Sequence, residues 1–180
     1  YEEQKSALKA LLKSDCGVLS AGTGFGKTVT AAALIAERKV NTIIIVQNHN
    51  LLEQWKKSIK EFLEITAGTI AGGKNKATGI IDIAIVNSLT GKGSDEVRPR
   101  SYKYGMVIVD ECHRSQFGDM HQAIRDTFPR PVFFGFTGTP IFEENKKKNS
   151  ETTDIFGNEL HRYTIADGIR DKNVLGFDVN

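Results

Sequence analysis

The stretch Ala21-Gly22-Thr23-Gly24-Phe25-Gly26-Lys27-Thr28 decides the fold of this chain. The apolar residues 17–20 precede it and predict a short buried strand, and residues 29–38 follow it with a helical pattern. A strand, a glycine-rich turn and a helix that opens on Gly-Lys-Thr form the context of a phosphate-binding P-loop. An ordinary glycine-rich turn is the alternative, but both flanking elements favour the P-loop.

The residue types of this P-loop (residues 21–28) suit phosphate binding. Gly22, Gly24 and Gly26 let backbone N–H groups approach phosphate oxygens without a Cβ in the way. The following helix points the positive end of its dipole at the same anion. Lys27 can reach the β- and γ-phosphates, and the Thr28 hydroxyl can ligate Mg²⁺. One departure is that Ala21 holds the position where the general pattern has glycine.

A second group of candidate site residues follows the apolar residues 106–109, which predict another strand. Asp110, Glu111 and His113 come directly after it. Because ligands bind at the carboxyl ends of strands in open α/β sheets, we expect this group to share one crevice with the P-loop. Asp110 suits Mg²⁺, and Glu111 can orient and deprotonate an attacking water. A helix-capping pair of acids is the alternative reading of these carboxylates.

The rest of the chain alternates between strand and helix patterns, which predicts a mostly parallel sheet with helices on both faces. Apolar stretches predict strands at 42–46, 66–71, 80–86, 131–136 and 159–165, and helical spacing predicts helices at 1–13, 51–63, 118–128 and 166–173. Asn50 is a candidate cap for the helix at 51–63, whose apolar stripe, Trp55 included, is interpreted as core. Thr137 and Thr139 follow the 131–136 strand, where their hydroxyls can bond the acids or His113.

Residues 72–79, 91–103 and 143–150 are polar or charged and predict exposed loops. For the basic loop 72–79, a solvated hairpin or crossover loop and contact with nucleic-acid phosphates remain equal alternatives.

Composition sets broad limits on what the chain does. It has 180 residues, 39% hydrophobic and 26% charged, with a net charge of +2, which neither requires nor excludes a nucleic-acid partner. Cys16 and Cys112 match no metal spacing and favour a reducing, cytoplasmic setting. No apolar run approaches the roughly 18 residues of a membrane span. Both ends of the sequence lie within element patterns, so we expect it to be part of a longer protein.

Taken together, these stretches resemble the superfamily 2 helicases and translocases. Residues 21–28 resemble their motif I, in which alanine in the first position is usual. Residues 46–55 resemble motif Ia, although the arginine that the family often carries near residues 48–50 is absent. Residues 110–113 resemble a DExH box, and Thr137-Gly138-Thr139 resembles motif III. Gln4 lies where the family often has an adenine-contacting glutamine.

A finer resemblance concerns the C-terminal half. Residues 113–118, 135–142, 152–157 and 163–169 are similar to the motor (R) subunit of type I restriction enzymes. The N-terminal half is more similar to repair and phage-type DExH helicases.

The resemblance implies a RecA-like P-loop NTPase lobe over residues 1–150, with a strand–helix extension over 151–180 toward a second lobe. It implies ATP and Mg²⁺ as cofactors and double-stranded DNA as the track. The P-loop residues, Thr23 and Phe25 included, and Gln4 would bind the nucleotide, with Lys27, Asp110, Glu111 and His113 catalytic and Thr137 and Thr139 coupling. Methyltransferase and specificity subunits are possible partners.

Three functions remain open from the sequence. The first is an ATP-driven DNA translocase lobe, and the second is a strand-separating repair helicase. The third is a module that uses ATP only as a switch, against which Glu111 argues because a switch has less need of a water-activating acid. RNA is an alternative track, since no base-reading residue is evident.

Overall fold

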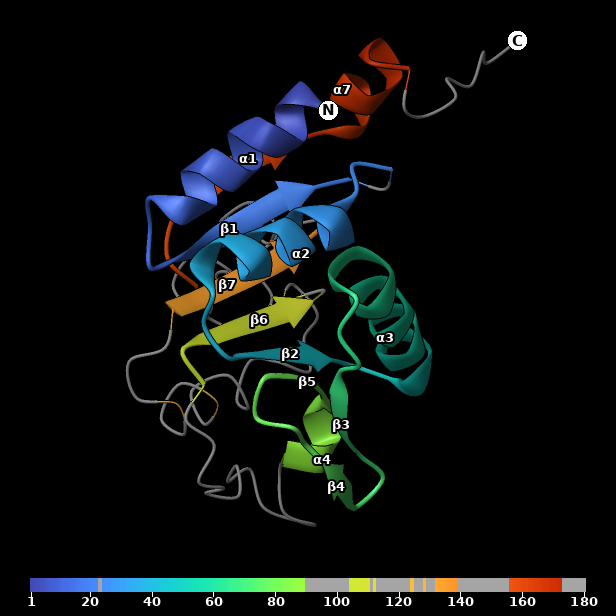
Figure 1. The fold of residues 1–180 in the computed structure, drawn as a ribbon. Helices are drawn as coiled ribbons and strands as arrows, with labels where there is room; N and C mark the ends of the chain where they lie inside the picture. Colours follow the sequence, from blue (N-terminus) through green and yellow to red (C-terminus); the bar gives the residue numbers. More distant parts are fainter. Residues whose placement is uncertain are drawn as a thin grey trace, which may run out of the picture.

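The computed structural model of the chain describes residues 1–22, 24–89, 104–110, 112, 124, 128, 132–138 and 156–172. In this part of the chain an eight-stranded sheet runs in the order β4-β3-β5-β2-β6-β7-β1-β8. Figure 1 shows the strands and the helices that accompany them. The helices are α1 (Glu2–Leu12), α2 (Lys27–Arg38), α3 (His49–Leu63), α4 (Val86–Leu89) and α7 (Ile165–Arg170). The strands are β1 (Cys16–Ala21), β2 (Thr42–Val46), β3 (Gly68–Ala71), β4 (Lys74–Lys76), β5 (Ile81–Ile85), β6 (Met106–Asp110), β7 (Val132–Thr137) and β8 (Glu159–Tyr163).

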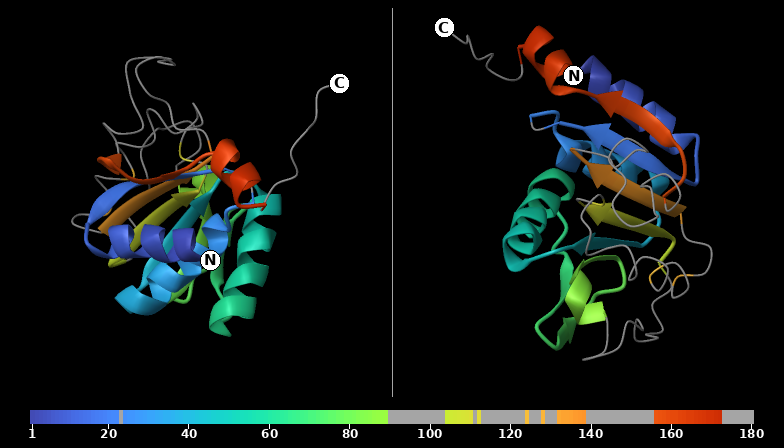
Figure 2. Two further views of the ribbon diagram at one scale, coloured as in Figure 1. Left: turned by 90° about the horizontal axis from the view of Figure 1, so that it is seen from above. Right: turned by 180° about the vertical axis from the view of Figure 1, so that it is seen from behind.

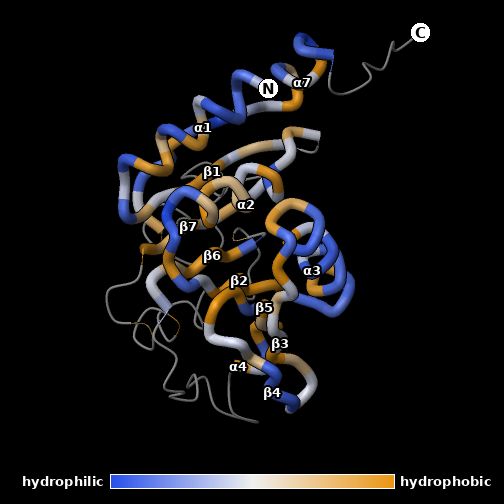
Figure 3. The backbone as a smooth tube through the Cα atoms, viewed as in Figure 1, coloured by the Kyte–Doolittle hydropathy of each residue, from blue (hydrophilic) through white to orange (hydrophobic). Residues whose placement is uncertain are grey.

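The strands β5, β2 and β6 are parallel and buried along their whole length. Ile44 of β2 pairs with Ile83 of β5 on one side and with Ile108 of β6 on the other. Strands covered on both faces read as continuous apolar runs, and Figure 3 shows this hydrophobic band through the middle of the molecule. The predicted α/β fold with a mostly parallel sheet is therefore confirmed.

Two hydrophobic clusters cover the two faces of the sheet, because successive strand residues point to opposite sides. Ile44 belongs to the cluster beneath α1, α2 and α3, and these helices lie together on one side of the sheet (Figure 2). Ile43 and Ile45 belong to the other cluster, which includes Val86 and Leu89 of α4. Helices thus cover both faces, as predicted.

The start of α3 differs from the prediction. Asn48, not Asn50, is the N-cap: its side chain accepts a hydrogen bond from the backbone N–H of Leu51 at 3.0 Å. Asn50 lies within the first turn of α3. The prediction was wrong because any of three adjacent polar residues can cap a helix, and only the backbone conformation selects one; Asn48 is extended, with φ −148° and ψ 171°.

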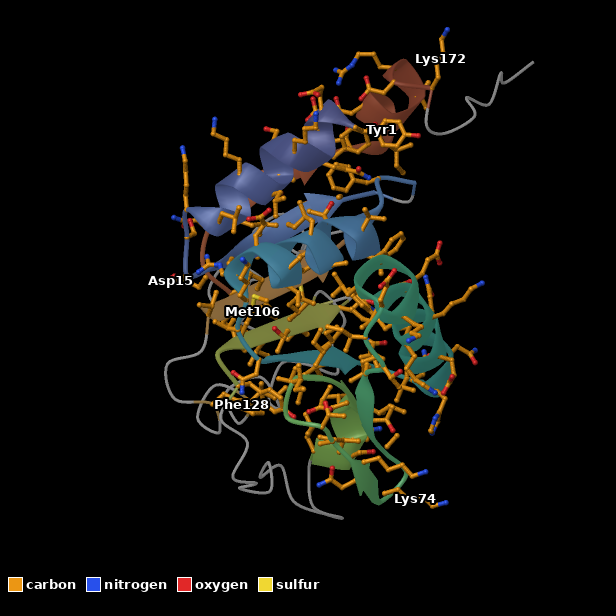
Figure 4. The ribbon with its side chains drawn as sticks, in the orientation of Figure 1. Tyr1, Asp15, Lys74, Met106, Phe128 and Lys172 are labelled. Carbon is orange, nitrogen blue, oxygen red and sulfur yellow. The ribbon has the colours of Figure 1, made fainter. Side chains whose placement is uncertain are left out.

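Residues 72–79 are not wholly a loop. Gly72 and Gly73 adopt positive φ values of 56° and 76° and turn the chain back. Lys74–Lys76 then form β4, which pairs antiparallel with β3 at the edge of the sheet. Figure 4 shows Lys74 at the end of the molecule far from Tyr1. Likewise, residues 86–89 form the short helix α4, which begins at Val86, the last residue of the strand predicted at 80–86.

The segment after residue 155 adds a strand to the same sheet. β8 pairs in parallel with β1, on the side of β1 away from β7. Thr164 caps α7 through a reciprocal pair of hydrogen bonds with Asp167, so this helix begins at Ile165.

Several expectations lie outside the described residues: the loops 91–103 and 143–150 and most of the predicted helix 118–128. Ile124 and Phe128 are described, and both are buried as expected of its inward face. No helix within the described ranges combines the length and the apolar character that crossing a membrane requires.

Candidate functional site

The P-loop forms at the carboxyl end of β1. Gly24 and Gly26 adopt φ values of 85° and 86°, a left-handed conformation that favours glycine. Gly26 is the N-cap of α2, no side chain of the described residues caps this helix, and its first turn contains no acid. The first N–H groups of α2 therefore point, together with the positive end of its dipole, at a position where an anion can bind.

Lys27 lies at the centre of this arrangement. Its Nζ donates a hydrogen bond of 2.9 Å to the backbone carbonyl of Ala21, across the base of the loop. A Cβ placed on Gly138, after β7, would lie 3.7 Å from both Lys27 Nζ and the Ala21 carbonyl oxygen. The end of β7 thus faces the lysine of the P-loop.

Gln4 contacts the P-loop directly. Its Nε2 donates a 2.7 Å hydrogen bond to the carbonyl of Phe25. It also lies so close to Gly26 that a Cβ at that position would collide with it. The sequence resemblance predicts that Gln4 lies near the nucleotide. In the structure, Gln4 extends from α1 and contacts the P-loop.

Phe25 turns its side chain away from the anion position. The ring is buried and packs against Tyr163 of β8, with ring centroids 4.9 Å apart, and against His161 at 6.0 Å. The backbone N–H of Gly22 donates to the Tyr163 carbonyl at 2.9 Å. Any contact of Phe25 with a phosphate would therefore involve its backbone. Its side chain packs the P-loop against β8.

Asp110 ends β6, the strand that lies between β2 and β7. Asp110 is 7% exposed, and its Oδ2 accepts a 2.7 Å hydrogen bond from the indole Nε1 of Trp55 on α3. β7 pairs with β1 on one side and with β6 on the other. Thr137 lies opposite Ser20 of β1, and Phe136 lies opposite Asp110 of β6. The carboxyl ends of β1, β7 and β6 therefore lie side by side, with Thr137 fully buried between them.

The residues present fit a bound Mg²⁺-nucleotide. Mg²⁺ usually takes one or two carboxylates together with substrate phosphates, and it does not need an all-protein cage. A carboxylate at the end of β6, the Thr28 hydroxyl in the first turn of α2 and an uncapped helix N-terminus provide the expected donors.

Four of the predicted site residues, Thr23, Glu111, His113 and Thr139, lie outside the described residues. The structure does bring Gln4, Phe25, Gly26 and Lys27 together and places Gly138 beside them.

Sequence reasoning missed three contributors: Trp55, His161 and Tyr163. Trp55 was interpreted as core, although a buried indole N–H requires an acceptor, which is the signal that could have identified it. The contact of His161 and Tyr163 with the P-loop had no signal, because it joins residues some 140 positions apart.

Comparison with known proteins gives matches over nearly the whole chain. The model of a family described as SWI2/SNF2 ATPase matches residues 2–179. A type I restriction enzyme endonuclease subunit of Staphylococcus saprophyticus is 36% identical over an alignment of 197 positions, gaps included. The alignment covers 98% of this chain and 21% of that subunit. The DNA 3'-5' translocase XPB2 of Sulfurisphaera tokodaii is 31% identical over 143 residues, covering 79% of this chain and 31% of the translocase. The chain thus spans between about a fifth and a third of these relatives.

Solved structures share the fold at lower identity. The UvsW helicase of bacteriophage T4 has a TM-score of 0.67 and 19% identity, covering 89% of this chain and 59% of the helicase. The ATP-dependent type ISP restriction-modification enzyme LlaBIII, bound to DNA, has a TM-score of 0.71 and 15% identity, covering 96% of this chain and 15% of the enzyme. At these identities the likeness concerns the fold alone, and it agrees with the expected RecA-like lobe.

Proposed function

The chain belongs to the SWI2/SNF2 ATPase family, and on that premise we propose that it is the first of two RecA-like lobes of a DNA translocase, binding and hydrolysing Mg-ATP. The resemblance to superfamily 2 helicases and to type I restriction subunits is confirmed by the family and by the relatives. The observation that carries the proposal is the uncapped N-terminus of α2, with Lys27 beside it and Gly138 facing that lysine.

We assign the roles of the site residues as follows. Backbone N–H groups of the P-loop and Lys27 would bind the phosphates and neutralise charge that develops on them. Thr28 and Asp110 would hold Mg²⁺, which supplies further charge stabilisation when bound. Glu111 would orient the attacking water and accept its proton.

The remaining assignments concern recognition, catalysis and coupling. Gln4 would recognise adenine and His113 would take part in catalysis, while Thr137 and Thr139 would couple the nucleotide site to the track. Each of these four roles rests on the sequence resemblance, and for Gln4 its contact with the P-loop adds support.

A second lobe would complete the enzyme. In related NTPases an arginine finger contributes roughly 10³–10⁵ in rate, and we assign that group to the second lobe. Residues 151–180 would lead toward it. The 180-residue chain alone should therefore bind nucleotide weakly and hydrolyse it very slowly, and robust DNA-stimulated turnover by this chain alone would contradict the assignment.

The track would run over the carboxyl edge of the sheet. The exposed His49 and Asn50 begin α3 after β2, and the Gly72–Gly73 turn follows β3. The N–H of Gly72 donates to Ser88 Oγ of α4 at 3.1 Å, which fixes this turn beside the end of β5. Lys74 and Lys76 are exposed nearby, so the groups at this edge suit contact with the phosphates of double-stranded DNA, without reading bases.

We further propose that the parent protein is the R subunit of a type I restriction enzyme, located in the cytoplasm and assembled with methyltransferase and specificity subunits. The 36% identity to such an endonuclease subunit supports this assignment. A DExH repair helicase is the second candidate, which the identity to a DNA translocase supports.

The deciding experiment measures ATPase activity of the parent protein with and without double-stranded DNA. We expect DNA to stimulate turnover, and Lys27→Ala and Glu111→Gln to abolish it. Lys9→Ala, which removes an exposed lysine of α1, is the matched control and should leave turnover unchanged.

Other outcomes would redirect the proposal. Stimulation by RNA instead of DNA would show that the track is wrong. Nucleotide binding without an effect of either nucleic acid would favour the switch module. With DNA stimulation established, strand-displacement assays would distinguish translocation from unwinding.

A further inference from the structure

We propose that Trp55 is a positioning residue that orients the Asp110 carboxylate for Mg²⁺. This inference rests on the proposed function, since it concerns the carboxylate assigned to the metal. It adds a residue of α3, a helix with no other assigned part in nucleotide chemistry, to the determinants of that site.

The contact itself is short and buried. Trp55 is 2% exposed and Asp110 is 7% exposed, and Nε1 lies 2.7 Å from Oδ2. Distances of about 2.7–2.9 Å are those of hydrogen bonds in which one partner is charged. The two residues come from separate elements 55 positions apart, so the bond joins the helical layer to the end of β6.

Packing alone does not explain an indole at this position. The other fully buried residues of the α3 stripe, Leu52 and Ile59, are aliphatic and need no hydrogen-bond partner. A tryptophan buried here requires an acceptor for its N–H, and a buried carboxylate is costly unless it accepts hydrogen bonds. Trp55 and Asp110 satisfy each other's requirement.

The consequence for the metal site follows from geometry. A hydrogen bond to Oδ2 restricts rotation of the carboxyl group about its Cβ–Cγ bond. Mg²⁺ demands near-octahedral geometry, so the orientation of a ligating or water-bridged carboxylate affects its affinity. Partners that hold metal ligands in place typically contribute about 10–100-fold to metal affinity or activity. A rotation of α3 would also turn the carboxylate through this bond.

The chain contains a single tryptophan, which makes the contact directly observable. Its ¹H–¹⁵N spectrum has one indole cross-peak, which needs no assignment strategy. We expect Asp110→Asn to shift this peak, and addition of Mg²⁺ with ADP to shift it in the unsubstituted chain. An indole peak that is identical in the Asp110→Asn chain would overturn the inference.

The second measurement is the Mg²⁺ concentration at half-maximal binding of a fluorescent ADP analogue. Trp55→Phe keeps an aromatic ring and removes the N–H, and we expect it to raise this midpoint by about 10–100-fold. Ile59→Val, one turn further along the same buried stripe, is the control for a packing defect and should leave the midpoint unchanged. Urea unfolding of both variants would verify that they remain folded.

The outcomes separate the two proposals. Equal Mg²⁺ midpoints for Trp55→Phe and Ile59→Val would overturn the positioning role while leaving the proposed function in place. Absence of Mg²⁺-dependent nucleotide binding by the unsubstituted parent protein would contradict the proposed function and this inference with it.

Discussion

Gly26 shows how one residue combines a backbone requirement with a side-chain contact. Its φ of 86° is unfavourable for any residue with a Cβ, and a Cβ would also displace the Gln4 amide that donates to the Phe25 carbonyl. Gly73 has a similar φ of 76° but nothing within 4 Å. We expect Gly73→Ala to lower the free energy of unfolding by about 1–2 kcal/mol, the cost of the left-handed conformation, and Gly26→Ala to lower it further.

Equilibrium unfolding of the two glycine variants tests this difference, and nucleotide binding should be lost in Gly26→Ala alone. Equal destabilisation would mean that Gln4 moves aside without cost.

Arg38 anchors the helix that carries Gln4. At the end of α2, its guanidinium donates to the carbonyls of Leu11 at 3.0 Å, of Leu12 at 3.4 Å and of Ser14, and lies 5.6 Å from the centre of the Phe134 ring. Charged hydrogen bonds contribute roughly 1.5–3 kcal/mol each, so we expect Arg38→Ala to lower the free energy of unfolding by at least about 2 kcal/mol.

Urea denaturation of the Arg38 variant would measure this loss. Lys5→Ala is the control, because it removes only an exposed ion pair with Glu2 and should leave stability almost unchanged. A similar small effect of both substitutions would contradict the anchoring role.

At the residue scale, the sequence predicts a contact where the residues that form it are close together in the chain. Lys27 and the glycines of the P-loop form a contiguous motif, so their arrangement follows from the sequence. The partners of Trp55, Phe25 and Arg38 are distant in the chain. Hydrophobic periodicity indicates that Trp55 faces inward but does not identify the atom that its N–H meets.

Among the elements, α3 offers a direct test of its start. Because Asn48 caps the helix, Asn48→Ala should cost about 1 kcal/mol of stability. Asn50→Ala, within the first turn, should be neutral or slightly stabilising because alanine favours helix. Thermal unfolding of the two variants distinguishes them, and the reverse order would restore Asn50 as the cap.

The capping pair of α7 predicts a pH dependence. Hydrogen bonds from the Thr164 hydroxyl and backbone lower the pKa of Asp167 below its ordinary value of 3.8. A lowered pKa means that the folded helix favours the ionised carboxylate. Its contribution is therefore present above pH 3.8 and is lost as the pH falls through the lowered pKa.

We expect the Thr164 and Gly168 amides to lose protection from hydrogen exchange in that acid range before the central sheet unfolds. In Thr164→Ala the pKa of Asp167 should return toward 3.8, which NMR titration of the carboxyl would show. An unchanged titration in this variant would contradict the assigned cause.

Strands were predicted correctly where the burial of apolar residues on both faces determines the structure. The strand at 42–46 was predicted with the observed bounds, because five consecutive β-branched residues suit a strand covered on both faces. β4 was missed because Lys74, Asn75 and Lys76 have weak strand preference. They are held by pairing with β3, a contact that composition does not indicate.

At the scale of the whole molecule, β8 ties the late part of the chain to the P-loop. Phe25→Leu removes the ring contacts with Tyr163 and His161, and aromatic pairs contribute about 0.5–1.5 kcal/mol beyond burial. We expect a loss of about 1 kcal/mol and faster hydrogen exchange at the Gly22 amide, which bonds to Tyr163.

Hydrogen-exchange NMR would measure the Gly22 amide directly. Phe62→Leu is the control, because Phe62 is 44% exposed on α3 and lies outside this contact. An unchanged Gly22 exchange rate in Phe25→Leu would show that β8 is held without the ring.

The overall architecture was predictable because strands and helices alternate along the chain, and parallel strands then require covered faces. The strand order was not predictable in detail. Placing β8 beside β1 depends on pairing between residues more than a hundred positions apart, for which no local pattern exists.

The two outer strands of the sheet also influence how the molecule behaves at high concentration. Open sheet edges can add strands from other copies, which leads to aggregation, and lysines or other charges on an edge oppose this. β4 consists of the exposed residues Lys74, Asn75 and Lys76, and β8 carries the Arg162–Glu159 ion pair of 2.7 Å. Charged outer strands therefore give this sheet, with its apolar interior, built-in resistance to edge-to-edge fibril growth.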